Sequence, residues 1–127
     1  MAPAGKDERS ARWTVEFYES GAEGSPVEAF LESLSFPAQV KVFNLIRLLE
    51  EHGVSLPFPY SSQITGRLRE LRTQLGKAHL RILYCATPRR TFLLLHGFIK
   101  RAPRTPTSAI DLANRRREEY LQRPGGR

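Results

Sequence analysis

The stretch "AHLRILYCATPRRTFLLLHGFI", residues 78–99, carries two strand patterns in succession. In 78–86 large apolar residues recur at every second position, which predicts a β-strand. The start of 91–99 is apolar on both faces, as is typical of a central strand that is covered on two sides. The linker "TPRR" between them has hairpin length and turn-forming residues. The stretch therefore predicts an antiparallel hairpin at the centre of a sheet.

A third strand is predicted over 67–72, directly before this hairpin. Leu68 and Leu71 would point to opposite faces if this strand were regular, so the pattern predicts a bulge or an edge position. The linker "TQLGK" is typical of a turn. Together the three strands predict an antiparallel meander.

The N-terminal half begins with a strand and two helices. Residues 12–18, "RWTVEFY", alternate between apolar and polar side chains, which predicts a half-buried strand. Helices are expected to begin at Pro26 and Pro37, and Gly53 is expected to end the second one. Residues 53–66 contain two prolines and clustered polar residues, which predict an extended loop.

A last helix follows the meander, with Thr105 as its N-cap and Pro106 as its first residue. The predicted order is β-α-α-β-β-β-α. This order indicates an α+β fold, a twisted antiparallel sheet with two N-terminal helices and one C-terminal helix packed on it. The 127 residues suffice for one domain, expected over 12–122, with flexible tails at 1–11 and 123–127.

The charge balance favours a polyanionic partner. The chain has 20 Lys and Arg against 13 Asp and Glu, a formal net charge of +7, which attracts nucleic acid first and acidic proteins second. Cys85 is the only cysteine, which excludes an internal disulfide and fits a reducing cytoplasm. No Cys and His spacing resembles a zinc site, and no signal peptide or membrane-spanning stretch is found.

Basic residues from several predicted elements are expected to converge. Neighbouring strands lie roughly 4.8 Å apart, so cations on one face of a sheet can surround a group of phosphate size. The alternative is that the same residues form ion pairs with carboxylates or lie on a solvated surface. They are Arg69 and Arg72 on the first strand of the meander, Arg81 on the second, and Lys100, Arg101 and Arg104 after the third.

Other residues near this cluster have more than one interpretation. Arg81 lies between apolar neighbours, where it needs a carboxylate such as Glu70 or an anionic ligand. Glu70 fits a salt bridge or a general base. On a regular strand His96 would share a face with Phe92, which favours a structural role over acid or base catalysis. Tyr84 is expected in the core with its hydroxyl group at an edge.

The segments "ELR" at Glu70–Arg72, "RILY" at Arg81–Tyr84 and "LLHGFIKRAPRTP" at Leu94–Pro106 resemble signature segments of the RelE/ParE toxin superfamily, and within it the phage-derived HigB-like branch. The resemblance implies a cytoplasmic toxin of a type II toxin–antitoxin pair. Such a toxin cleaves messenger RNA at the ribosomal A site and is neutralised by an antitoxin, often a helix-turn-helix protein. It needs no metal or cofactor, because the enzyme assists attack of the RNA 2′-hydroxyl on the adjacent phosphate.

The resemblance also implies roles for individual residues. Arg81 would hold the scissile phosphate, and Lys100 and Arg101 would stabilise the transition state or donate a proton. Glu70 stands where RelE-type members carry a catalytic lysine, so either Glu70 is the general base or catalysis depends on electrostatics and ribosomal RNA. The predicted catalytic residues are therefore Arg81, Lys100, Arg101 and Glu70, and the predicted RNA-binding residues are Arg69, Arg72, Tyr84, His96 and Arg104.

Three alternatives to the nuclease are open. A ParE-like inhibitor of DNA gyrase would not need the basic cluster. A non-catalytic basic module would bind an acidic or amphipathic segment of a partner. The glutamate at position 70 also permits an inactive descendant of a toxin. Growth arrest that is lost on Arg81→Ala or Lys100→Ala would favour the nuclease over a binding module.

Overall fold

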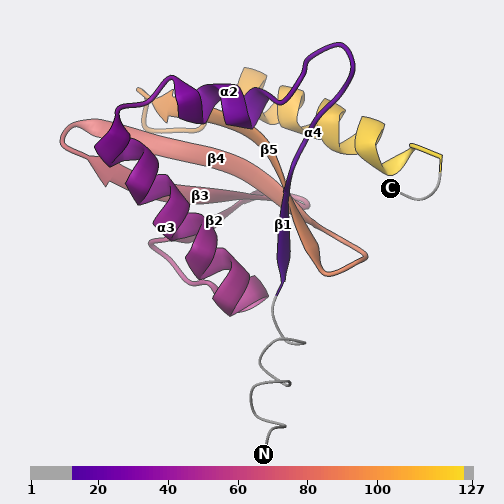
Figure 1. Ribbon diagram of the computed structural model, residues 1–127, viewed down its shortest axis with the longest axis horizontal. Coiled ribbons are helices and arrows are strands. Elements are labelled where there is room, and N and C mark those ends of the chain that lie inside the picture. Colours follow the sequence, from indigo (N-terminus) through magenta and orange to yellow (C-terminus); the bar gives the residue numbers. More distant parts are fainter. Residues whose placement is uncertain (1–12, 125–127) are drawn as a thin grey trace, which may run out of the picture.

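The computed structural model describes residues 13–124, which form an α+β fold with a five-stranded mixed sheet and three α-helices (Figure 1). The expected fold class and element order are confirmed, with one additional strand. The expected N-terminal tail, residues 1–11, lies outside the described residues. So do residues 125–127 of the expected C-terminal tail. The elements are β1 (Thr14–Phe17), α2 (Pro26–Glu32), α3 (Phe36–His52), a 3-10 turn (Gly53–Ser55), β2 (Ser61–Thr65), β3 (Leu68–Leu75), β4 (Ala78–Thr87), β5 (Thr91–Lys100) and α4 (Thr107–Leu121).

The strand order in the sheet is β1-β5-β4-β3-β2. The pairs from β2 to β5 are antiparallel, but β1 runs parallel to β5, with Thr14 opposite Thr91. The expectation of a purely antiparallel sheet is therefore wrong at this edge. Parallel neighbours need a long connection rather than a hairpin, and the chain between β1 and β5 contains two helices and three strands.

The additional strand is β2, within the segment that was expected to be an extended loop over 53–66. It pairs with β3 at the edge of the sheet, and its register shifts between Gln63 and Thr65. Its sequence "SSQIT" contains one large apolar residue, Ile64, so hydrophobic alternation does not reveal it. Its hydrogen bonds to β3 make it a strand.

The expected edge position of β3 is wrong, and the expected bulge lies in its partner β2, where the register shifts between Gln63 and Thr65 opposite Arg69 and Leu68. β3 lies inside the sheet and pairs with β4 without a register shift from Arg69 to Leu75. Leu68 and Leu71 do point to opposite faces, and both are fully buried because helices cover both sides of the sheet. Two apolar faces on one strand thus indicate a doubly covered sheet here.

Two hydrophobic layers enclose the sheet. α2 and α3 pack on one face, against apolar residues such as Ile82 and Leu94, and α4 packs on the other, against residues such as Leu83 and Leu93 (Figure 1). We call these the α3 face and the α4 face. Close packing on the α3 face requires Gly97, because a Cβ atom there would run into the ring of Phe30 from α2.

A β-bulge at Leu95 changes which face the end of β5 presents. Tyr84 pairs with Leu94, but its neighbour Leu83 pairs with His96, so Leu95 is an extra residue. The carbonyl oxygen of Leu95 accepts a 2.8 Å hydrogen bond from Nη1 of the buried Arg116 of α4. Before the bulge the even-numbered residues of β5, such as Leu94, face α3. From His96 to Lys100 the even-numbered residues therefore face α4.

Candidate functional site

The side chain of Arg81 is the centre of the candidate site. It belongs to β4, faces α4 and is 7% exposed. Its Nη1 donates hydrogen bonds to the carbonyl oxygens of Thr73, at 3.2 Å, and Leu80, at 3.0 Å. Burial lowers the pKa of Arg81, the charge of Arg72 lowers it further, and Glu70 raises it. Because arginine keeps its proton in proteins, the result is a fixed cation with little surrounding water.

Glu70 is the buried counter-charge of this arginine. Its side chain is 1% exposed, and its Oε1 lies 3.6 Å from Nε of Arg81 and 3.5 Å from Nη1 of Arg72. Its Oε2 accepts a 2.7 Å hydrogen bond from the hydroxyl group of Thr105. The carboxylate thus joins β3, β4 and the loop 101–106, and it is not open to a substrate.

The hydrogen bond from Thr105 to Glu70 also corrects the predicted start of the last helix. Pro106 is the N-cap of α4, and the helix begins at Thr107. The hydroxyl group of Thr105 cannot cap the helix because it is directed at the buried carboxylate. The threonine therefore fixes the loop over the sheet instead.

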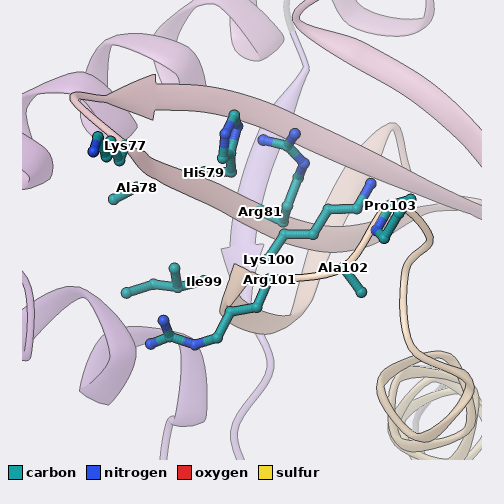
Figure 2. Close-up of a pocket in the computed structure, with 9 residues that line it drawn as sticks. All are labelled: Lys77, Ala78, His79, Arg81, Ile99, Lys100, Arg101, Ala102 and Pro103. Carbon is teal, nitrogen blue, oxygen red and sulfur yellow. The ribbon is translucent and has the colours of Figure 1, made fainter.

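His79 and Lys100 lie opposite each other in the β4–β5 register, next to Arg81. Figure 2 shows the three side chains on the same side of the sheet, whereas Arg101 extends in the opposite direction from Lys100. The bulge at Leu95 is responsible, because without it Lys100 would lie on the α3 face. The bulge therefore brings Lys100 to the face of the sheet that carries His79 and Arg81, whereas a regular strand would place Lys100 on the other face.

Two open hollows meet at His79 and Arg81. The first hollow has a volume of about 750 Å³ and is also lined by Lys77, Lys100 and Arg101 (Figure 2). The second hollow has a volume of about 390 Å³, shares His79 and Arg81, and is also lined by Lys41, Tyr60 and Arg72. Among the described residues, the lysines and arginines are the charged side chains that line them, so both hollows attract anions.

Two of the predicted RNA-binding residues lie on the other side of the sheet. Arg69 and Tyr84 face each other across β3 and β4 on the α3 face. Tyr84 is 2% exposed, and its hydroxyl group lies 2.6 Å from Oγ of Ser61, which also accepts a 3.0 Å hydrogen bond from Nε of Arg69. Since side chains alternate along a strand, Arg69 cannot join Glu70 and Arg72.

The remaining predicted residues are placed differently again. His96 lies on the α4 face, not beside Phe92, because of the bulge. Its Nδ1 is 3.5 Å from Nη1 of Arg116, and burial, with a smaller effect of this arginine, lowers the pKa of His96. It lines neither hollow. Arg101 and Arg104 are exposed on the loop 101–106.

Several residues of the hollows were missed in the sequence, among them Lys41, Tyr60, Lys77 and His79. The alternation that places Arg81 on one face of β4 also places His79 there, so this histidine could have been found. Tyr60 stands in a segment that was expected to be loop, and it is recognisable only as an aromatic residue between a proline and a polar strand.

Among residues 13–124, no group of three or more His, Cys, Asp and Glu side chains is arranged to hold a metal ion. None of the helices in this range has the length and apolar character needed to cross a bilayer.

Comparison with known proteins places the chain in a family. Residues 29–118, more than half of the chain, match the model of a family described as "Phage derived protein Gp49-like (DUF891)". The matched range begins in α2 and ends in α4, so it includes every residue of the first hollow. No curated protein matches the chain significantly.

Proposed function

The chain belongs to the Gp49-like family of phage-derived proteins, a RelE/HigB-like toxin family associated with toxin–antitoxin systems, and from this premise we propose that it is an endoribonuclease that cleaves messenger RNA on the ribosome. The proposed functional unit is the single domain 12–122. Membership in a toxin–antitoxin family implies an antitoxin as partner. That the partner is a helix-turn-helix protein, and that the toxin is of the HigB type, are part of the proposal.

The observation that carries the proposal is the buried cation of Arg81 between two open basic hollows. A phosphate bound there meets a guanidinium group whose orientation is already fixed by two backbone hydrogen bonds. Because this guanidinium group is buried, such a charge-assisted hydrogen bond is stronger than one at a fully exposed side chain. Arg81 is therefore suited to bind the scissile phosphate and to stabilise the negative charge that develops on it.

The proposed reaction is an internal transfer within the RNA. The 2′-oxygen forms a bond to the adjacent phosphorus while the bond from phosphorus to the 5′-oxygen breaks, which leaves a 2′,3′-cyclic phosphate and a 5′-hydroxyl group. His79 accepts the proton of the 2′-hydroxyl, since imidazole is the commonest general base and no carboxylate of residues 13–124 lines the hollows. Lys100, opposite His79 in the register, donates the proton to the leaving oxygen.

Glu70 has a positioning role in this scheme. Its contacts with Arg81, Arg72 and Thr105 account for both of its oxygens, and it is buried beneath the site. It holds the guanidinium groups and the loop 101–106 in place. Arg101 and Arg104, which are exposed on that loop, are proposed to contact the phosphates of messenger or ribosomal RNA.

The test is tightly controlled expression followed by mapping of messenger RNA 5′ ends. We expect growth arrest and new cuts inside translated frames with the wild type. His79→Gln and Lys100→Ala should reduce the cuts by about 100-fold or more, as is usual for loss of an acid or base. Arg89→Ala is the matched control, because it removes a positive charge from the exposed β4–β5 turn without touching the hollows.

Each outcome has a distinct meaning. Arrest without any new 5′ ends would contradict the nuclease and point to another target such as DNA gyrase. Cuts that persist in both variants, with the proteins present at wild-type levels, would show that the catalytic groups lie elsewhere. Equal loss with Arg89→Ala would mean that net charge, rather than the site, determines activity.

A further inference from the structure

The second hollow differs from the first in that an aromatic residue lines it. We propose that this hollow binds a base of single-stranded RNA next to the phosphate held by Arg81, and that Tyr60 stacks on that base. This inference rests on the proposed function. It assigns a base-binding role to a residue outside the strands and loop that carry the proposed catalytic groups.

The position of the second hollow fits a neighbouring nucleotide. It shares His79 and Arg81 with the first hollow, so a phosphate at Arg81 stands at the junction between them. A phosphate in RNA has one nucleoside on each side, and each hollow can take one of them. The second hollow, at about 390 Å³, lies within the range of about 300–1,000 Å³ that is usual for small-ligand sites.

The exposure of the aromatic residues fits stacking. Tyr60 is 44% exposed and Phe58 is 68% exposed, although both are large side chains that folding normally buries. The guanidinium group of Arg72 lies 5.0 Å from the centre of the Phe58 ring. Of the two rings, that of Tyr60 lines the hollow and is open to a ligand.

The segment that carries Tyr60 is held in place by backbone hydrogen bonds. The amide of Tyr60 donates to the carbonyl oxygen of Pro57 at 3.0 Å, and its own carbonyl oxygen accepts from the amide of Arg72 at 2.9 Å. Nε of Arg72 donates to the carbonyl oxygen of Pro59 at 3.2 Å. A ring on a fixed backbone loses little conformational freedom when a ligand binds, which favours affinity.

The positive charges around the ring of Tyr60 suit the RNA backbone. Lys41 and Arg72 line the second hollow together with Arg81, and the hollow has no acidic lining residue among those described. Proteins that hold single-stranded nucleic acid combine a basic groove for the backbone with aromatic rings for the bases. An acidic protein segment would use the cations but would not need an open ring above them.

The test compares cleavage of messenger RNA on translating ribosomes by purified variants. Tyr60→Leu should reduce the cleavage rate at low substrate concentration by roughly 10- to 100-fold, which is the usual effect of losing one stacked base. Tyr60→Phe keeps the ring and should stay within about twofold of the wild type. The control Phe43→Leu removes a ring of similar exposure, 51%, from α3, outside both hollows, and should change nothing.

A second measurement does not depend on any variant. In a ribosome programmed with 2′-O-methylated messenger RNA that contains 4-thiouridine in the A-site codon, the wild type should form a photo-crosslink within the peptide that includes Tyr60. A wild type that cleaves, together with an unaffected Tyr60→Leu or an equally defective Tyr60→Phe, would overturn the stacking site alone. A wild type that cleaves no RNA would overturn the proposed function and the stacking site with it.

Discussion

Replacement of Glu70 by glutamine gives the sharpest test of how the site is built. The amide oxygen of Glu70→Gln can still accept the hydrogen bond from Thr105, but the charge opposite Arg81 and Arg72 disappears. Removal of one partner from a buried ion pair costs about 3–5 kcal/mol. Arg81 keeps its two hydrogen bonds to backbone oxygens, and Arg72 is 24% exposed, so we expect the lower end of this range, about 3 kcal/mol.

The measurement is urea unfolding followed by far-UV circular dichroism. With a typical slope of about 1–3 kcal/mol per molar urea, a loss of about 3 kcal/mol lowers the midpoint by roughly 1–3 M. Thr105→Val is the matched comparison, because it removes only the hydrogen bond to Glu70 and should cost about 1.5–3 kcal/mol, which is usual for a hydrogen bond to a charged group. A change below about 0.5 kcal/mol for Glu70→Gln, which is usual for surface sites, would refute the assignment of Glu70 as the buried counter-charge.

Three further predictions concern the core. Burial raises the pKa of Cys85 to about 11, so a thiol reagent at about pH 8 should label it only after the protein unfolds in urea. Burial lowers the pKa of His96 below its ordinary value of about 6.5. At a pH between these two values the unfolded chain binds more protons than the folded protein. The free energy of unfolding should therefore fall as the pH drops from about 7 to about 5.5. His96→Gln should flatten this part of the profile, and an unchanged profile would contradict the assignment. Gly97→Ala should lower stability by about 1–3 kcal/mol in the same urea assay because of the clash with Phe30, whereas Gly21→Ala, with nothing within 4 Å, should have little effect.

The strands that carry the site could be predicted because their signals are local. Alternation in 78–86 and the two apolar faces of 91–99 depend only on neighbouring residues, and β4 and β5 have nearly these bounds. The parallel contact of β1 with β5 could not be predicted in this way. Its partners are far apart in sequence, and nothing within "RWTVEF" specifies which strand lies beside it.

The side-chain arrangement of the site was harder to predict, and the bulge at Leu95 is the main reason. In "LLLHGF" the glycine indicates either a bulge or a close backbone approach, but it does not show that Leu95 is the extra residue. That residue determines on which face Lys100 lies. Arg69 was grouped with Arg72 by charge alone, although three residues of separation put them on opposite faces of a strand. Glu70 was expected near Arg81, and the structure brings them together, but its burial depends on the loop that brings Thr105 over it.

The parallel pairing of β1 with β5 has a consequence for synthesis of the chain. β1 leaves the ribosome early, but its partner strand is complete only when residue 100 has been made. The sheet therefore closes by a contact between distant parts of the sequence, which slows folding relative to a fold built from local contacts. Lys100 and Thr105 are added last among the groups around Arg81. A nascent chain that stalls before them lacks both the complete strand that pairs with β1 and the Lys100 side of the first hollow, so the whole site forms only after this part of the chain has been made.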